Sequence, residues 1–482
     1  MSFSEFERLL GDESRRGPAP AGAFTGAAGG AACGDLARIS LAIERGRVVA
    51  ARFDSEGCGA MRAATAAAAE IAEGTAVLEA ARIGATTIEA ALGGLTPGKR
   101  HAAQLAADAL HRALASAAAG AEALAPPSID RVLVAISGGV DSAVAALLER
   151  ERGAEVVAVT LKLWADPRSD GSKACCSPEA VVGARALAHS LAIPHLTLDL
   201  EEEFRRRVVG AFLSGHAAGQ TPNPCVLCNG EVRIAAMVDL ADRLGAASLV
   251  TGHYARIAGD EDGPLLASAA DAAKDQSYML AALPPALLAR LRFPLAALSK
   301  REVRELAARH GLAVARKAES QDLCFLAGQG KREFLRANGE IADHSGEIRD
   351  RGGRRLGRHR GHHHFTVGQR RGIGVAAPAP LYVLAVDAGR NAVTVGPREA
   401  LETREVRVRD AVLHRQGAMV DAVRLRYHSA ALPARVVGAN GAGRYDSLRI
   451  ELEEAFAGAA PGQTAVMMAG EEIVGHATIA AS

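Results

Sequence analysis

The feature that most constrains the fold is a six-residue turn, SGGVDS at 137–142, between a short apolar run and a helical repeat. The run RVLVAI (131–136) is typical of a buried strand, and SAVAALLER (142–150) has apolar residues at helical spacing. Further strand candidates are VVAVTLKLW (156–164), HLTLDL (195–200) and ASLVTGHY (247–254), with a helix over ARALAHSLAI (184–193). Strands that alternate with helices predict a doubly wound, parallel α/β sheet.

The turn itself predicts a phosphate site. Its glycines let the backbone approach phosphate oxygens, and the following helix offers unpaired N–H groups and a positive dipole end. Asp141 is placed to hold Mg²⁺. The pattern is neither GxxxxGK[ST] nor GxGxxG, so we expect it to bind the pyrophosphate of ATP rather than a transferred γ-phosphate.

The remaining segments predict a chain of several domains. An alanine-rich stretch at 112–128 ends in a double proline and is typical of a linker. From about residue 402, short alternating segments separated by Gly, Asn and Pro predict a small antiparallel β-barrel. The expected division is an α+β front domain with its linker at 1–125, the ATP-binding domain at 126–335, a connector at 336–400 and the barrel at 401–482.

Composition bears on the cellular compartment and on partners. Seven cysteines in 482 residues do not form a disulfide scaffold, and neither a signal sequence nor a membrane span is visible, so we expect a soluble cytoplasmic protein. The net charge is only +1, so a nucleic-acid site must be local. Residues 349–374 hold eight arginines and one acid, which predicts RNA contact there. The triplet at 362–364 is not expected to bind metal, because neighbouring histidines on a strand point to opposite faces.

The cysteines at 225 and 228 lie in TPNPCVLCN, and Cys324 follows about a hundred residues later in ESQDLCF. Structural zinc usually takes four ligands, and a redox pair of the thioredoxin type begins a helix in a fold of its own. Three thiols near an ATP site therefore favour sulfur chemistry over either alternative. Cys175 and Cys176 receive no role.

Seven motifs, SGGVDS, LKLW, TPNPCVLCN, VTGHY, KDQSYML, ESQDLCF and FTVGQRRGIG, occur in the order found in the bacterial tRNA-specific 2-thiouridylase family, and residues from about 129 to 482 resemble it. The resemblance implies that ATP adenylates the C2 oxygen of the wobble uridine in tRNAs for Lys, Glu and Gln. Sulfur then replaces the oxygen, and AMP and pyrophosphate are released. A cysteine desulfurase or a sulfur-relay protein would supply the sulfur.

The resemblance also assigns roles to individual residues. Cys228 would be the nucleophile and Cys324 the persulfide carrier, and the two would close a disulfide after sulfur delivery. The cations Arg316 and Lys317 lie beside Cys324 in the sequence and would favour its thiolate. The positions implied for ATP are Ala135, Ile136, Ser137, Gly138, Gly139, Val140, Asp141, Ser142, Leu161 and Gly252. Those implied for tRNA are Asn223, Pro224, Cys225, His253, Lys274, Asp275, Gln276, Arg426, Tyr427 and Gln463.

Cys225 departs from the aspartate that many members of the family carry. Three thiolates, from Cys225, Cys228 and Cys324, suit an iron–sulfur cluster with one iron open to bind hydrosulfide. The spacing does not separate this route from a persulfide route, and both stay open.

Residues 30–115 resemble the NifU/IscU-like iron–sulfur scaffold family. Cys33, Asp35 and Cys58 match its ligands, and His101 matches its histidine, but Ala102 stands where a third cysteine is expected. A degenerate scaffold that relays sulfur or iron, and a domain without any metal role, are both compatible with this pattern.

Two other functions remain as alternatives. A ligase that adenylates a small molecule would use SGGVDS but has no need of Cys228 and Cys324. A non-enzymatic iron–sulfur carrier would release no AMP or pyrophosphate.

Overall fold

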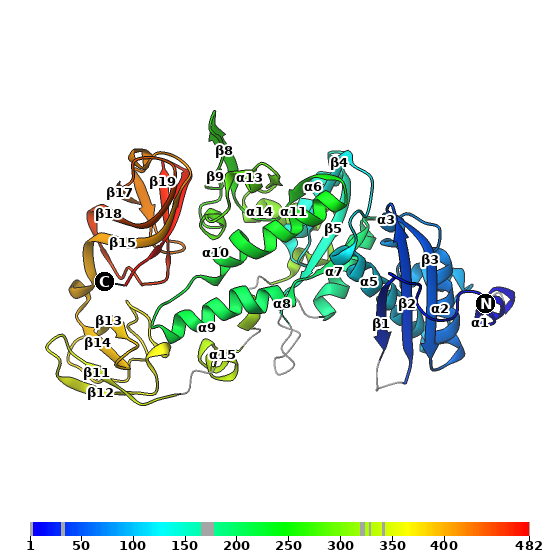
Figure 1. Ribbon diagram of the computed structural model, residues 1–482, viewed down its shortest axis with the longest axis horizontal. Coiled ribbons are helices and arrows are strands. Elements are labelled where there is room, and N and C mark those ends of the chain that lie inside the picture. Colours follow the sequence, from blue (N-terminus) through cyan, green and yellow to red (C-terminus); the bar gives the residue numbers. More distant parts are fainter. Residues whose placement is uncertain are drawn as a thin grey trace.

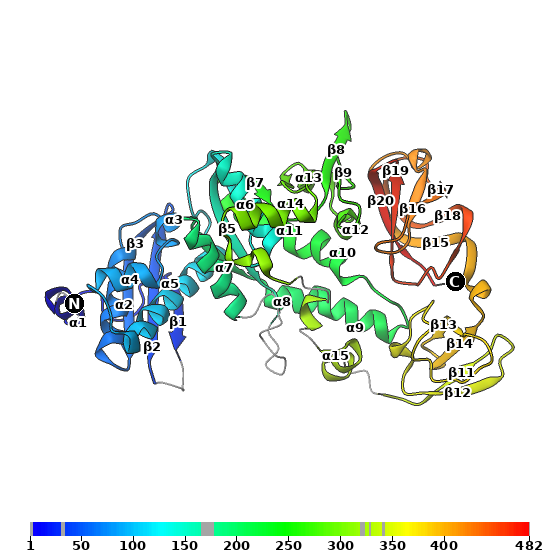
Figure 2. The same ribbon diagram turned by 180° about the vertical axis from the view of Figure 1, so that it is seen from behind.

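The computed structural model describes residues 3–29, 34–164, 178–318, 323–326, 329–339 and 343–481. The chain is elongated: the N-terminal unit lies at one end, the α/β unit in the middle, and the C-terminal barrel lies next to a smaller sheet at the other end (Figures 1 and 2). No helix in the described part is long and apolar enough to cross a membrane.

The N-terminal unit packs helices on an antiparallel sheet of order β1-β2-β3. The first strand and the long helix of this unit pack closely at Gly26. A Cβ added to Gly26 would lie only 2.2 Å from the backbone nitrogen of Ala113, so the two backbones are in direct contact there. The long helix runs to Gly120 with its alanines buried, so much of the stretch at 112–128 is core helix and the expectation of a linker there was wrong. The elements are Phe3–Leu10 (α1), Phe24–Gly29 (β1), Leu36–Glu44 (β2), Arg47–Glu56 (β3), Gly59–Ala72 (α2), Val77–Ala80 (α3), Ala85–Ala91 (α4) and Arg100–Gly120 (α5).

The second unit confirms the predicted parallel α/β sheet. Its strand order is β10-β7-β4-β5-β6 and all pairings are parallel. The strands are Ser128–Ala135 (β4), Glu155–Lys162 (β5), His195–Asp199 (β6), Ala246–Val250 (β7) and Leu291–Arg292 (β10). The helices are Val140–Glu151 (α6), Pro178–Ser190 (α7), Glu201–Phe204 (α8), Gly210–Ala217 (α9), Pro224–Cys228 (α10), Ile234–Arg243 (α11), Ser277–Leu280 (α12), Pro285–Leu288 (α13), Lys300–Arg309 (α14) and Lys331–Asn338 (α15).

The N-terminal unit is joined to this sheet through α5, which packs against the edge strand β6. The backbone N–H of His195 donates to the carbonyl of Ala81 at 3.1 Å, and the rings of His111 and His189 lie 5.4 Å apart between centroids. The two units therefore share a buried contact.

The stretch expected to be a connector is a small sheet of its own, of order β12-β11-β14-β13. Its strands are Gly346–Arg349 (β11), Arg355–His359 (β12), Tyr382–Asp387 (β13) and Ala392–Gly396 (β14). A compact apolar cluster that includes Ile348, Phe365 and Val393 holds it together.

The C-terminal unit is the predicted barrel, because β15 pairs with both β18 and β20 and so closes the sheet. Its strands are Glu402–Leu413 (β15), Ala422–Arg424 (β16), Leu432–Val437 (β17), Gly443–Ala457 (β18), Thr464–Ala469 (β19) and Glu472–Ile479 (β20). A hairpin of Arg256–Asp260 (β8) and Gly263–Ala267 (β9) leaves the α/β unit and pairs with β20. The barrel sheet is thus extended by a segment about 200 residues earlier in the chain.

Candidate functional site

The phosphate loop has the geometry expected of SGGVDS. It connects β4 to α6, and Gly138 adopts φ +71°, a conformation that favours glycine. The Ser142 hydroxyl accepts from the backbone N–H of Ser137 at 3.2 Å and donates to the carbonyl of Gly139 at 3.1 Å. The loop is therefore held closed over the N-terminus of α6.

Two lysines that the sequence analysis did not assign to this loop form hydrogen bonds with it. Lys300 Nζ lies 2.7 and 2.8 Å from the two carboxylate oxygens of Asp141, and Lys317 Nζ donates to the carbonyl of Gly138 at 2.8 Å. The hydroxyl of Tyr254 also donates to Asp141, at 2.9 Å. A signal for these lysines existed, since the chain has only seven lysines among 56 basic residues. Lys317, expected to favour the Cys324 thiolate, is instead hydrogen-bonded to the phosphate loop.

Gly252 fixes the distance between the strand β7 turn and the loop. A Cβ there would lie 2.7 Å from the backbone nitrogen of Ser142, closer than real side chains approach. Of the next two residues, His253 lines the thiol pocket described below, and the hydroxyl of Tyr254 donates a hydrogen bond to Asp141. Residues 252–254 therefore connect the phosphate loop to the pocket.

The three cysteines line one cavity of about 170 Å³, here called the thiol pocket. Cys225 and Cys228 come from α10, and Cys324 comes from a short 3₁₀ turn about a hundred residues later. The other lining residues are mostly apolar, with Arg233, His253, Gln276 and Asn229 as the polar exceptions. The structure thus brings together the thiols that the sequence keeps apart.

The sequence TPNPCVLCN explains how α10 presents its thiols. Asn223 caps the helix by accepting from the Val226 N–H at 3.3 Å, and Pro224 occupies the first turn, where its missing N–H costs nothing. The CxxC pair does begin a helix, which the sequence analysis did not expect, and the i, i+3 spacing puts both cysteines on one face. Cys58, Cys225, Cys228 and Cys324 are all thiols, so the expected disulfide between Cys228 and Cys324 does not appear here.

Electrostatics differ between the groups in the pocket. Burial raises the pKa of the Cys225 thiol, and the nearby Arg233 guanidinium offsets part of that effect. Burial, with a further contribution from Arg233, lowers the pKa of His253 to about 3, so its imidazole is neutral at physiological pH. Its Nδ1 lies 2.8 Å from the Thr251 hydroxyl. Arg233, rather than the expected Arg316, is the cation at the pocket wall.

The residues predicted to touch tRNA cluster where the barrel meets the α/β unit. Gln463 Nε2 donates to the carbonyl of Thr221 at 2.7 Å, beside the TPNPCVLCN segment. Burial and then the nearby Asp275 and Cys225 raise the pKa of Tyr427, and the ring of this residue lies 5.9 Å from that of Tyr278 between centroids. Asp275 itself is buried in an ion pair with Arg424, at 2.7 Å. Its carboxylate positions the barrel, whereas Gln276 lines the thiol pocket.

Two further predicted tRNA positions lie near this junction. Arg426 donates to the carbonyl of Gly458 at 3.1 Å and lies over the ring of Phe456. The backbone N–H of Lys274 donates to the carbonyl of Asp271 at 3.0 Å, in the turn before Asp275.

The predicted ligands of the N-terminal unit also converge. His101 Nε2 lies 2.9 Å from the Asp35 carboxylate, and the Cys58 sulfur lies 3.9 Å from it. Burial alone would raise the pKa of Asp35, but the hydrogen bond from His101 lowers it on balance. Ala102, at the position where the family's third cysteine is expected, is buried in α5, and this helix contains no cysteine. Cys33 lies outside the described residues, as do Cys175 and Cys176.

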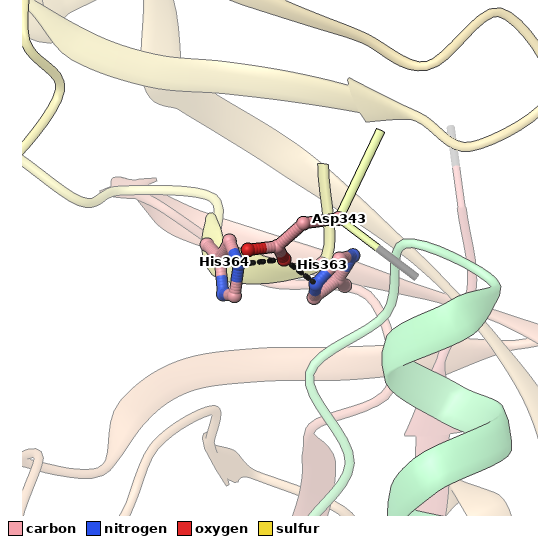
Figure 3. A group of neighbouring side chains, drawn as sticks. All are labelled: Asp343, His363 and His364. Carbon is pink, nitrogen blue, oxygen red and sulfur yellow. Dashed lines mark hydrogen bonds and ion pairs between the residues drawn. The ribbon is translucent and has the colours of Figure 1, made fainter. Parts of the chain in front are cut away.

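The histidine triplet differs from the expectation of a strand. His362–His364 form a 3₁₀ turn between β12 and β13, so His363 and His364 lie on the same side, together with Asp343 (Figure 3). A cavity of about 490 Å³ borders Asp343 and His364. Four arginines line it, Arg332, Arg336, Arg358 and Arg360, two of them from the predicted basic stretch.

Comparisons with known proteins cover all four units. The family models that match are the tRNA methyl transferase HUP domain (residues 130–328), the NifU-like N terminal domain (13–120), the tRNA methyl transferase PRC-barrel domain (332–397) and the Aminomethyltransferase beta-barrel domain (403–479).

Full-length relatives agree with these matches. The chain is 47% identical over 468 residues to the "Bifunctional protein NifU/MnmA" of Rubrobacter xylanophilus, covering 94% of this chain and 93% of that protein. It is 43% identical over 355 residues to the "tRNA-specific 2-thiouridylase MnmA" of Chloroflexus aurantiacus, covering 72% of this chain and 98% of that protein. A solved structure, the U34-tRNA thiolase NcsA from Methanococcus maripaludis, is 19% identical with a TM-score of 0.28, covering 43% of this chain and 63% of that one.

Proposed function

Because the chain belongs to the tRNA-specific 2-thiouridylase family, in its fused NifU/MnmA form, we propose that it replaces the C2 oxygen of the wobble uridine of tRNA with sulfur, using ATP. The tRNAs for Lys, Glu and Gln are the proposed substrates. One observation carries the proposal: three cysteines from two distant segments line one pocket, which residues 252–254 connect to the phosphate loop.

In the first step, the uridine C2 oxygen attacks the α-phosphorus of ATP and pyrophosphate leaves. The N-terminus of α6 and the ammonium groups of Lys300 and Lys317, which contact the loop at Asp141 and Gly138, would stabilise the negative charge that develops on pyrophosphate. The carboxylate of Asp141 would hold Mg²⁺, which neutralises phosphate charge when bound. The uridine N3 proton leaves in this step and returns when the sulfur–sulfur bond breaks in the second step and the C2 thiocarbonyl forms.

In the second step, a persulfide on Cys324 attacks C2 and AMP leaves, so the uridine is joined to Cys324 through two sulfurs. Cys228 then attacks the Cys324 sulfur. The sulfur–sulfur bond breaks, the outer sulfur stays on C2, and Cys228 and Cys324 close a disulfide that an external thiol must reduce. The persulfide would come from a cysteine desulfurase or a sulfur-relay protein. The mostly apolar wall of the pocket keeps water from the adenylated uridine.

A cluster route remains as the alternative for the same pocket. The thiols of Cys225, Cys228 and Cys324 suit three cluster ligands, because all three line one cavity. A bound cluster would supply hydrosulfide at its open iron. Because the pKa of Cys225 is raised, its thiol loses the proton at alkaline pH or when a bound metal ion displaces the proton.

The test is thiolation of tRNA by anaerobically purified full-length protein, read as 2-thiouridine by mass spectrometry, with iron measured in parallel. We expect Cys228→Ser and Cys324→Ser to abolish the product, while Cys58→Ser, in the N-terminal unit, retains it when persulfide is supplied chemically. If Cys324→Ser still thiolates, the proposed chemistry is wrong. Cys225→Asp separates the routes: activity without iron supports the persulfide, and joint loss of iron and activity supports the cluster.

A second activity is proposed for the N-terminal unit on the convergence of Asp35, Cys58 and His101. These groups would bind iron or zinc and pass iron or sulfur toward the thiol pocket. Metal content of the Cys58→Ser and His101→Ala proteins tests this, since unchanged content would leave the unit without a metal role.

A further inference from the structure

The unit around β11–β14 contains a second group of ligating side chains, far along the chain from the thiols. Asp343 Oδ1 lies 2.9 Å from His364 Nε2 and 3.4 Å from His363 Nε2 (Figure 3). One ligand atom from each residue lies within 4.8 Å of the other two, and this is the one such group found in the described part of the chain. The distances are those of donors that surround a single ion.

Protein contacts do not account for the orientation of His363. Its side chain is 2% exposed, and its Nε2 is buried without a hydrogen bond of good geometry. A buried imidazole nitrogen without a well-formed hydrogen bond costs free energy, and a metal ion bound beside the carboxylate would give it a partner.

The adjacent His362 shows what a structural histidine looks like here. Its Nδ1 lies 3.1 Å from the Asn391 side-chain oxygen, and its Nε2 lies 2.9 Å from the carbonyl of Ala217. Both nitrogens are therefore used by protein atoms. His363 and His364 instead face Asp343, to which His364 Nε2 is hydrogen-bonded at 2.9 Å, while His363 Nε2 has no well-formed hydrogen bond.

We propose that Asp343, His363 and His364 bind a divalent transition-metal ion such as Zn²⁺. Two imidazoles and one carboxylate suit Zn²⁺ and leave at least one coordination position open. Asp343 and His364 border the arginine-lined cavity, so water or an anion can enter from that side. The arginines weaken the binding of a bare cation and favour an anion at the open position.

Metal binding is measured with Zn²⁺ by competition against a chromophoric chelator, using the full chain. We expect Asp343→Asn, His363→Phe and His364→Phe each to bind one equivalent less than the parent protein. The matched control, His362→Gln, keeps that equivalent. Asp343 is partly exposed and its replacement by asparagine is nearly isosteric, so this variant folds even if the histidine variants do not.

The thiols of the other sites also bind Zn²⁺, and Co²⁺ separates the two classes. The difference spectrum between the parent and Asp343→Asn should show ligand-field bands without a sulfur-to-metal charge-transfer band. Equal stoichiometry in the parent and Asp343→Asn overturns the proposal. So does a difference spectrum that contains the sulfur band.

Discussion

Gly252→Ala tests the link between the phosphate loop and the thiol pocket. The new Cβ would lie 2.7 Å from Ser142 N and 2.8 Å from the Asp141 carbonyl carbon, whereas ordinary contacts begin at 3.4 Å. Both neighbours are backbone atoms at the start of α6, so the helix end or the β7 turn must retreat by about 0.7 Å. Overpacking of this kind costs about 1–3 kcal/mol of unfolding free energy.

The catalytic effect should be larger than the loss of stability suggests. A displacement of about 1 Å in a catalytic group lowers rates by about a hundredfold, so we expect kcat/KM for ATP to fall by about tenfold to a hundredfold. Pyrophosphate release and 2-thiouridine formation measure the rate, and urea denaturation measures stability. Gly183→Ala is the control, because nothing lies within 4 Å of its Cβ and its backbone is helical. Wild-type kinetics in Gly252→Ala would show that this glycine does not set the loop position.

Three further predictions follow from the described contacts. Arg424→Ala leaves the buried Asp275 carboxylate without its ion pair, so urea denaturation should show a loss of about 3 kcal/mol, and Arg424→Lys should restore part of it. Lys317→Met removes the ammonium bonded to Gly138, so the KM for ATP should rise by about tenfold while iodoacetamide still labels the cysteines; an unchanged KM refutes a role at the loop. Burial lowers the pKa of His195 to about 3 from 6.5, so its contribution to stability is complete above pH 6.5 and is lost at about 1.4 kcal/mol per unit as the pH falls toward 3. In His195→Gln, the free energy of unfolding, measured by thermal unfolding between pH 7 and 5, should depend less steeply on pH, by the slope that corresponds to one bound proton.

The order of elements and the strand–turn–helix geometry of the phosphate loop were predictable from the sequence. Each of those predictions depends on neighbours in the chain: an apolar run, two glycines and a helical repeat define β4, the turn and α6. The strands of the barrel were found for the same reason. The seven ordered motifs then identified the thiols, although not their distances.

Contacts between distant segments were not predictable. Nothing near Lys300 or Lys317 in the sequence points to residues 138 and 141, and only the scarcity of lysine offered a signal. The pairing of β9 with β20 joins segments about 200 residues apart. The triplet at 362–364 was expected on a strand, but a 3₁₀ turn directs His363 and His364 to one side. The alanine-rich end of α5 was taken for part of a linker because the stretch ends in a double proline at 126–127.

The hairpin of β8 and β9 also has a consequence for synthesis of the chain. Its partner strand β20 leaves the ribosome about 200 residues later, which at about 5–20 residues per second is a delay of roughly 10–40 s. During that interval, the outer edge of β9 presents unpaired backbone groups and the apolar Leu265 and Leu266. The nascent chain therefore carries an open sheet edge until its last strand arrives, and truncation before β20 should expose the same edge permanently and promote aggregation.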